Sequence, residues 1–263
     1  MVESIEELRK ICQGTDKWPQ RRISIYITKF LLRTSITADQ VTVLDIIVGF
    51  VGSAFLFLRG CLYPFIGALL LQLFIILDLV DGEVARYRYY PRTIPVGKGR
   101  NPVSEFLQDI LERPIYSLAL FGLSFGVYQS MQDATVLILG FSAALFLLLN
   151  SLTDLDRERL MTGDSDHMRS FKRMKGSLLF RNTFLNRLID AAAFVLQTIG
   201  VTVIILIGIM IDYAFTFLHY YGFPLPSLNI KYLIILFYGL MYPLLWIVNI
   251  FFSVRILDKT QCG

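Results

Sequence analysis

Six long stretches of this chain contain no charged residue, and they constrain its fold more than any other feature of the sequence. They cover residues 46–58, 62–77, 115–128, 134–152, 191–211 and 232–254. Most of them can be extended to the roughly 20 residues that a helix needs to cross a bilayer. With 55% hydrophobic residues and a mean hydropathy of +0.58, the chain is also too apolar for an ordinary soluble domain. The sequence therefore predicts an all-α, polytopic integral membrane protein with six transmembrane helices.

Lys and Arg residues indicate which ends of these helices face the cytoplasm. They lie before residue 40, between residues 86 and 113, between residues 157 and 187, and after residue 254, and these regions hold 23 of the 25 basic residues. Because cytoplasmic loops carry the excess of Lys and Arg, this distribution predicts that both termini are cytoplasmic. The net charge of +4 then reflects topology and attraction to anionic lipids, and we expect no nucleic-acid partner.

Residues 1–35 precede the first span and have the pattern of an amphipathic segment. Residues 3–12 and 22–33 each combine apolar and charged side chains at helical spacing. The second stretch suits a helix in the membrane interface, and a helix packed on protein is the alternative. Thr37 or Asp39 can cap the helix that follows. We therefore expect an interfacial segment over residues 1–35 and a six-helix membrane domain over residues 36–263.

Two carboxylates stand at the cytoplasmic end of the second apolar stretch. Asp78 and Asp81 are three residues apart and share a helical face, and Gly82 and Ala85 leave space beside them. Ionisable residues in a membrane span are costly, by about 3 kcal/mol each on insertion scales, so they indicate a functional site. This arrangement can form part of a site for a divalent cation.

A second pair of acids begins the third span. Glu105 and Asp109 are four residues apart, hence on one helical face, and they lie at the same expected depth as the first pair. Such a pair alone is often solvated charge that favours a helix start. Four carboxylates side by side would repel one another unless metal ions neutralised them. The spacing therefore predicts that the four acids converge on bound metal.

These residues resemble the signature of the CDP-alcohol phosphotransferases. Asp78-x-x-Asp81-Gly82-x-x-Ala85-Arg86 matches every fixed position in the first half of that signature, and the acids four residues apart correspond to the second half. Upstream, Thr37-Ala38-Asp39-Gln40-Val41-Thr42 is similar to a family segment that often reads Thr-Pro-Asn-Gln-Val-Thr. In length and in its six spans, the resemblance covers nearly the whole chain.

The resemblance implies an integral-membrane transferase with its active site on the cytoplasmic side. Such an enzyme moves a substituted phosphate group from a CDP-alcohol to the hydroxyl of an alcohol or phosphorylated alcohol and releases CMP, as in phospholipid or polar phosphodiester synthesis. Two Mg²⁺ or Mn²⁺ ions would assist the transfer. The implied site comprises the metal ligands Asp78, Asp81, Glu105 and Asp109, with Asp109 also the catalytic base, and the substrate-binding residues Gly82, Ala85, Arg86 and Thr42.

The second half of the signature departs from the family pattern. The loop after Arg86 is longer, Asn101 stands where the family has a glycine, and Glu105 stands where it has an aspartate. A competing register takes Gly97 as the glycine, and Asn101 and Glu105 then occupy the acid positions. We prefer the first register because it keeps both carboxylates and starts the third helix after a proline.

Other polar and small residues have a second interpretation. Asp45 and Asp212 lie near predicted helix ends, which favours side chains that reach the interface. Arg181 and Arg187 could bind a phosphorylated acceptor, but topology explains them equally well. Residues 122 and 126 form a Gly-x-x-x-Gly pattern, which permits close helix packing within the bundle or in a homodimer.

Two further classes of function remain open. Transporters also place acids in the membrane, but here the acids lie at one edge and no internal repeat is visible. A divergent member that binds a CDP-alcohol or lipid without turnover would explain Glu105 and the missing glycine.

The predicted topology can be tested by labelling single cysteines in a variant that lacks the three native ones. Cysteines placed at Asp133 and at Ser227 should react with an impermeant thiol reagent added outside the cell, and a cysteine at Ser165 should not. The opposite pattern would invert the topology and put Asp78 and Asp81 on the wrong face for cytoplasmic CDP-alcohols.

Overall fold

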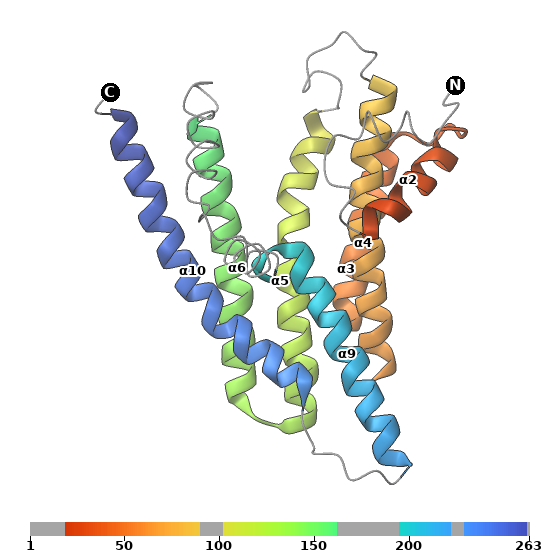
Figure 1. Ribbon diagram of the computed structural model, residues 1–263, viewed down its shortest axis with the longest axis vertical. Coiled ribbons are helices and arrows are strands. Elements are labelled where there is room, and N and C mark those ends of the chain that lie inside the picture. Colours follow the sequence, from red (N-terminus) through yellow and green to blue (C-terminus); the bar gives the residue numbers. More distant parts are fainter. Residues whose placement is uncertain (1–18, 90–101, 162–194, 222–228, 262–263) are drawn as a thin grey trace, which may run out of the picture. The chain divides into compact units, whose positions relative to one another are not determined.

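The computed structural model describes residues 19–89, 102–161, 195–221 and 229–261, and these residues are almost entirely helical (Figure 1). They contain no β-strand, which confirms the all-α prediction, and six of the helices are long and apolar enough to cross a membrane. The predicted helix over residues 3–12 lies outside the described residues. The helices are α2 (Pro19–Leu31), α3 (Ala38–Phe55), α4 (Leu62–Tyr89), α5 (Pro102–Met131), α6 (Ala134–Met161), α9 (Thr198–Tyr220) and α10 (Ile230–Gln261).

The chain divides into two compact units, Met1–Ala119 and Leu120–Gly263. The first unit holds residues 78–86, which we call the acidic motif. In this unit α3 packs along α4, and α2 packs against α4 as well. The start of α3 is fixed by Thr37, whose hydroxyl accepts a hydrogen bond from the Gln40 amide, while the Gln40 side chain accepts one from the Thr37 amide. This capping box satisfies two helix-end donors and confirms the expected cap.

Glycines let α3 and α4 approach closely. A methyl group added to Gly67 of α4 would lie 2.7 Å from the backbone oxygen of Gly52 of α3, too close for a real carbon atom. Small residues are the usual means by which membrane helices pack at short range. The pairing of these two helices therefore depends on the absence of side chains at this crossing.

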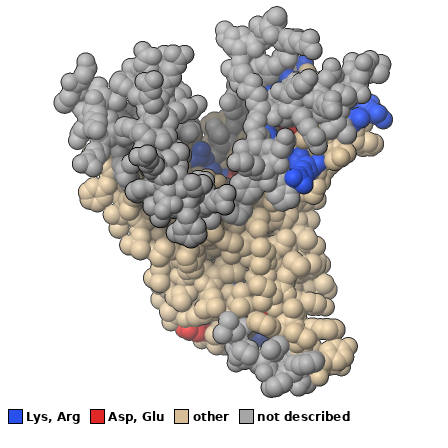
Figure 2. Space-filling view, viewed as in Figure 1, with Lys and Arg blue, Asp and Glu red and all other residues tan. Residues whose placement is uncertain are grey.

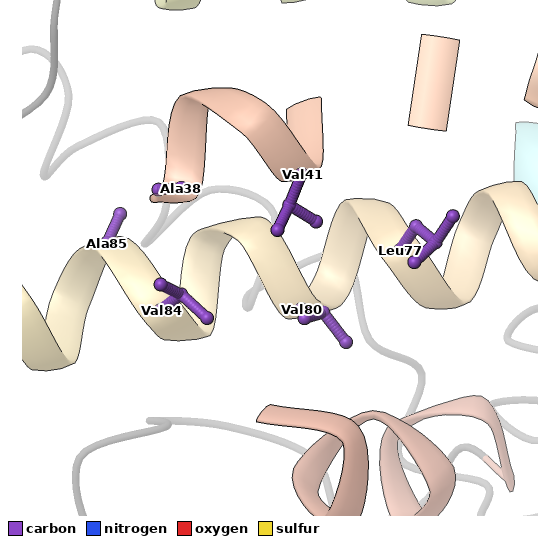
Figure 3. Packing of buried hydrophobic residues seen from close by; sticks show 6 residues of the cluster. All are labelled: Ala38, Val41, Leu77, Val80, Val84 and Ala85. Atoms are coloured by element: carbon purple, nitrogen blue, oxygen red, sulfur yellow. The ribbon is translucent and has the colours of Figure 1, made fainter. Parts of the chain in front are cut away.

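An apolar cluster surrounds the acidic motif, and Figure 3 shows six of its residues. Ala38 and Val41 of α3 pack with Leu77, Val80, Val84 and Ala85 of α4. In this view Val41 points toward α4, whereas Val80 and Val84 point to the opposite side of α4 (Figure 3). Ile27, Leu31 and Leu32 from α2 and the residues after it pack against the same cluster. The motif helix is thus covered by α3 and by the N-terminal segment.

A buried carboxylate fastens α2 to α4. The Ser24 hydroxyl donates a hydrogen bond of 2.8 Å to Oε1 of Glu83, and the Thr28 hydroxyl donates one of 2.7 Å to Oε2. Arg21 Nε lies 3.7 Å from Oε1. The side chains of Ser24, Thr28 and Glu83 are fully buried, so each carboxylate oxygen is satisfied by a donor from α2. We call these four residues the Glu83 clamp.

The C-terminal end of α2 is held by a second contact from α4. Arg88 Nη2 donates hydrogen bonds to the backbone oxygens of Leu31 and Thr34, at 3.2 and 2.7 Å. A basic side chain that binds the last carbonyls of a helix also favours the negative end of its dipole. Together with the Glu83 clamp, this contact fixes α2 along the half of α4 that carries the acidic motif.

The outward face of α2 remains apolar. Ile23, Tyr26 and Phe30 are at least half exposed, while Arg22 and Arg33 nearby are also exposed. Figure 2 shows that the middle of the described surface is almost free of charged side chains in this view, and that most of the visible Lys and Arg side chains gather in its upper part. The sequence left open an interfacial helix or a helix packed on protein. The structure shows that α2 packs on α4, and its outward face has the composition of an interfacial helix.

The second unit is built from α6, α9 and α10, in which α10 packs on α6 and on α9. Polar side chains join the helices: Ser142 of α6 donates to the backbone oxygen of Gly239 of α10 at 3.0 Å, and Asn150 donates to that of Tyr242 at 3.3 Å. Asp212 of α9 forms an ion pair of 3.0 Å with Lys231 and accepts a hydrogen bond from the Ile230 amide. Asp212 is therefore paired with a cation at the start of α10.

The Glu83 clamp predicts a specific stability defect. Replacing Ser24 with Ala and Thr28 with Val leaves the buried carboxylate without its two hydroxyl donors, which should cost roughly 2–4 kcal/mol of unfolding free energy. This loss should lower the melting temperature of the purified protein in detergent, which is the quantity to measure. Adding Glu83→Met to the double variant should restore much of the loss, because the unsatisfied buried charge is then gone. Ser35→Ala, an exposed hydroxyl beyond α2, is the matched control. An equal loss in the control, or no loss in the double variant, would contradict the clamp.

Candidate metal centre

Three carboxylates from two helices meet in the first unit. Asp78 and Asp81 come from α4, and Asp45 comes from α3. One oxygen atom from each carboxylate lies within 4.8 Å of one from each of the other two. These residues form the acidic triad, and its spacing is short enough for one cation to contact all three.

Neighbouring side chains orient two members of the triad. The Thr42 hydroxyl, one turn before Asp45 on α3, donates a hydrogen bond of 2.7 Å to Asp81 Oδ2. From α5, Gln108 Nε2 donates one of 2.5 Å to Asp78 Oδ1. Each of these contacts uses a neutral donor, so it fixes a carboxylate without supplying a positive charge.

Burial makes the charge of the triad costly. Asp45 and Asp81 are each 1% exposed. Oδ1 of Asp45 is buried and has no hydrogen-bond partner. Carboxylates at this separation repel one another, and burial strengthens the repulsion. A hard divalent cation with oxygen ligands would compensate this charge, so the residues present fit Mg²⁺ or Mn²⁺.

A further acid lies close by on α5. Glu112 interacts electrostatically with both Asp78 and Asp81, and the Tyr116 hydroxyl donates to Glu112 Oε1 at 3.4 Å. Glu112 and Gln108 are four residues apart, so they share a helical face. This face of α5 is directed at the motif helix.

The other motif residues on α4 fall into two environments. Arg86 Nε donates to the backbone oxygen of Gly82 at 2.9 Å, and a methyl group at Gly82 would lie 3.2 Å from Arg86 Nη2. The guanidinium of Arg86 therefore lies against Gly82. Ala85 is buried in the apolar cluster with Ala38. Ala85 therefore packs between helices. Thr42, the substrate-binding candidate on α3, donates its hydrogen bond to Asp81.

Several predicted site residues cannot be placed. Glu105 and Asp109 belong to α5, but their side chains lie outside the described part of the structure. Arg181, Arg187, Gly97 and Asn101 also lie outside the described residues. The convergence of all four signature acids, the acceptor site and the choice of register therefore stay predictions.

The sequence interpretation of Asp45 was wrong. A side chain that reaches the interface would be exposed, whereas Asp45 is buried beside Asp78 and Asp81. The signal was present in the spacing of α3: residues 38, 42, 45, 49 and 52 recur at helical intervals and are all buried. Asp45 is the one acid on a face otherwise composed of small residues and a hydroxyl. Gln108, Glu112 and Glu83 were also missed, because they occupy variable positions of the signature or lie outside it.

Comparison with models of known protein families finds no match, and comparison with curated protein sequences finds none either.

Proposed function

We propose that this protein is an integral-membrane CDP-alcohol phosphotransferase. The observation that carries the proposal is the acidic triad: the two aspartates of the Asp-x-x-Asp-Gly motif come together with a third carboxylate in a buried environment. Thr42 and Gln108 orient the two motif aspartates from two other helices. These contacts support the proposal, because they fix both motif carboxylates beside a third one.

In the proposed reaction, an acceptor hydroxyl attacks the phosphorus of the CDP-alcohol that is distal to cytidine. The new phosphorus–oxygen bond forms as the bond to the CMP phosphate breaks, and CMP leaves. Bound divalent cations would stabilise the charge on the phosphate oxygens and on the leaving group. Asp78 and Asp81 would hold the cations, with Glu105 as a further ligand.

The acceptor proton needs a base, and we assign this role to Asp109. In the chain Asp109 stands between Gln108 and Glu112, which both interact with acids of α4. A positioned carboxylate can take the proton as the hydroxyl oxygen attacks. Asp109 would also complete the set of metal ligands.

Arg86 and Gly82 are suited to the nucleotide end of the substrate. The absence of a side chain at Gly82 leaves the guanidinium of Arg86 against the helix backbone. A planar cation in this position can bind a phosphate oxygen with two donors. Thr42 acts on the site through Asp81, and Arg181 and Arg187 are candidates for binding a phosphorylated acceptor.

The remaining assignments follow from the same proposal. The donor is a CDP-alcohol and the acceptor an alcohol or phosphorylated alcohol, in phospholipid or polar phosphodiester synthesis. The active site and both termini face the cytoplasm, as expected from the excess of Lys and Arg in the loops on that side. The Gly-x-x-x-Gly pattern of the third span permits a homodimer.

Release of CMP tests the proposal. The purified protein, given a panel of CDP-alcohols and acceptors with Mg²⁺ or Mn²⁺, should release CMP and should stop when EDTA is added. Asp78→Asn should abolish this release while the protein stays folded, since an amide cannot replace an anionic ligand. Asp156→Asn, an exposed acid of α6, is the control and should retain activity. Binding of CDP-alcohol without CMP release in any combination would favour the non-catalytic alternative.

The register of the second motif half has its own test. In the preferred register Asp109→Asn should lower the rate by about 10²–10⁴, the usual contribution of a general base, with little loss of nucleotide binding. Glu105→Asp should stay active or improve. In the competing register Asp109→Asn would be nearly silent and Asn101→Asp would raise the rate, so the effect of Asp109→Asn distinguishes the two registers.

A further inference from the structure

Asp45 lies outside every part of the acidic motif, on a different helix. We infer that Asp45 is a ligand of the divalent cation, supplied by α3 to the site that Asp78 and Asp81 form on α4. This inference rests on the proposed function, because it concerns the cation of the same site, but it makes separate predictions about cation binding.

The first argument is distance. One carboxylate oxygen of Asp45 lies within 4.8 Å of one from Asp78 and one from Asp81. Ligand oxygens around a single Mg²⁺, each about 2.1 Å from the ion, are separated by roughly 3–4 Å. A small movement of side chains therefore brings all three oxygens into one coordination sphere.

The second argument is an unsatisfied atom. Asp45 is 1% exposed, and its Oδ1 is buried without a hydrogen-bond partner. Buried polar atoms in folded proteins nearly always have a partner. A buried atom without a partner from the protein chain therefore points to a bound ion or water molecule. A cation held between the three carboxylates would satisfy this atom.

The third argument is the rigidity of α3. Thr42, three residues before Asp45, is anchored to Asp81. Gly49, four residues after it, packs so closely that an added methyl group would lie 2.8 Å from Cδ1 of Ile115 on α5. The helix therefore cannot rotate to expose Asp45 without breaking contacts on either side of it. This is the arrangement expected when a ligand must be held in place.

A proton shared between Asp45 and the other carboxylates is the competing explanation of their proximity. It would neutralise part of the charge without any metal, as in other close carboxylate pairs. In that case removing the charge of Asp45 would leave cation affinity unchanged. The two explanations therefore differ in a measurable quantity.

Binding of Mn²⁺ alone provides the test. The full-length protein in detergent is titrated with Mn²⁺, and the electron paramagnetic resonance signal of free Mn²⁺ gives the affinity. Changes to residues that only support a metal ligand commonly weaken binding about 10–100-fold, so the loss of a direct ligand in Asp45→Asn should weaken it by at least about 100-fold. Asp39→Asn, which alters an acid at the start of the same helix, is the matched control and should bind as the unmodified protein does.

Thermal unfolding separates a ligand from a structural residue. The unmodified protein should melt at a higher temperature with Mn²⁺ than with EDTA, because ligands that bind the folded state stabilise it. In Asp45→Asn this increment should shrink, whatever the melting temperature in EDTA. A variant whose melting temperature changes equally in both conditions would show that Asp45 acts on the fold alone, and would overturn the inference.

The outcomes also separate this inference from the proposed function. If Asp78→Asn abolishes Mn²⁺ binding and Asp45→Asn leaves it unchanged, the inference is wrong, and the proposed function is still decided by CMP release. If Asp45→Asn weakens binding but no CDP-alcohol yields CMP, the inference stands and the proposed function fails. If the unmodified protein does not bind Mn²⁺, the inference is wrong as well.

Discussion

The first unit is organised by the need to compensate carboxylates buried between apolar helices. Asp45, Asp81 and Glu83 are almost completely buried, and each would be expensive to keep charged without compensation. Asp81 and Glu83 are two residues apart, so they project from different sides of α4. The helix thus presents one buried acid to α3 and another to α2. The negative charge of each acid is compensated in a different way.

On the α2 side, the protein chain itself compensates the charge. Glu83 receives one hydroxyl donor at each oxygen and has a guanidinium nearby, all from one short helix. This contact joins α2, whose outward face is apolar and exposed, to Glu83, the neighbour of Gly82 on α4. On the α3 side, Thr42 and Gln108 provide neutral donors, while the acidic triad and Glu112 gather negative charge. The contrast between the two sides is what distinguishes a structural acid from the candidate metal centre.

The sequence predicted the helices of this fold well, because each span is long and free of charge. All six apolar stretches lie within or overlap helices that could cross a membrane, and Thr37 caps α3 as expected. Two of the three triad residues were predicted as metal ligands. Asp78 and Asp81 share one helix, so spacing alone places them together, whereas Asp45 joins them only through the packing of α3 on α4. Glu83 stands at a variable position of the signature, and its hydroxyl partners are 59 and 55 residues away in the chain, so periodicity could not reveal its role either. Contacts within one helix follow from periodicity, and contacts between helices require the tertiary structure.

The most direct measurement of the central claim is a crystal structure of the protein grown with Mn²⁺ and CDP, with diffraction data collected at the manganese absorption edge. The account predicts an anomalous peak roughly 2–2.5 Å from carboxylate oxygens of Asp78 and Asp81, with the diphosphate of CDP beside it. Ordered CDP at another place, or a triad without an anomalous peak at saturating Mn²⁺, would contradict it.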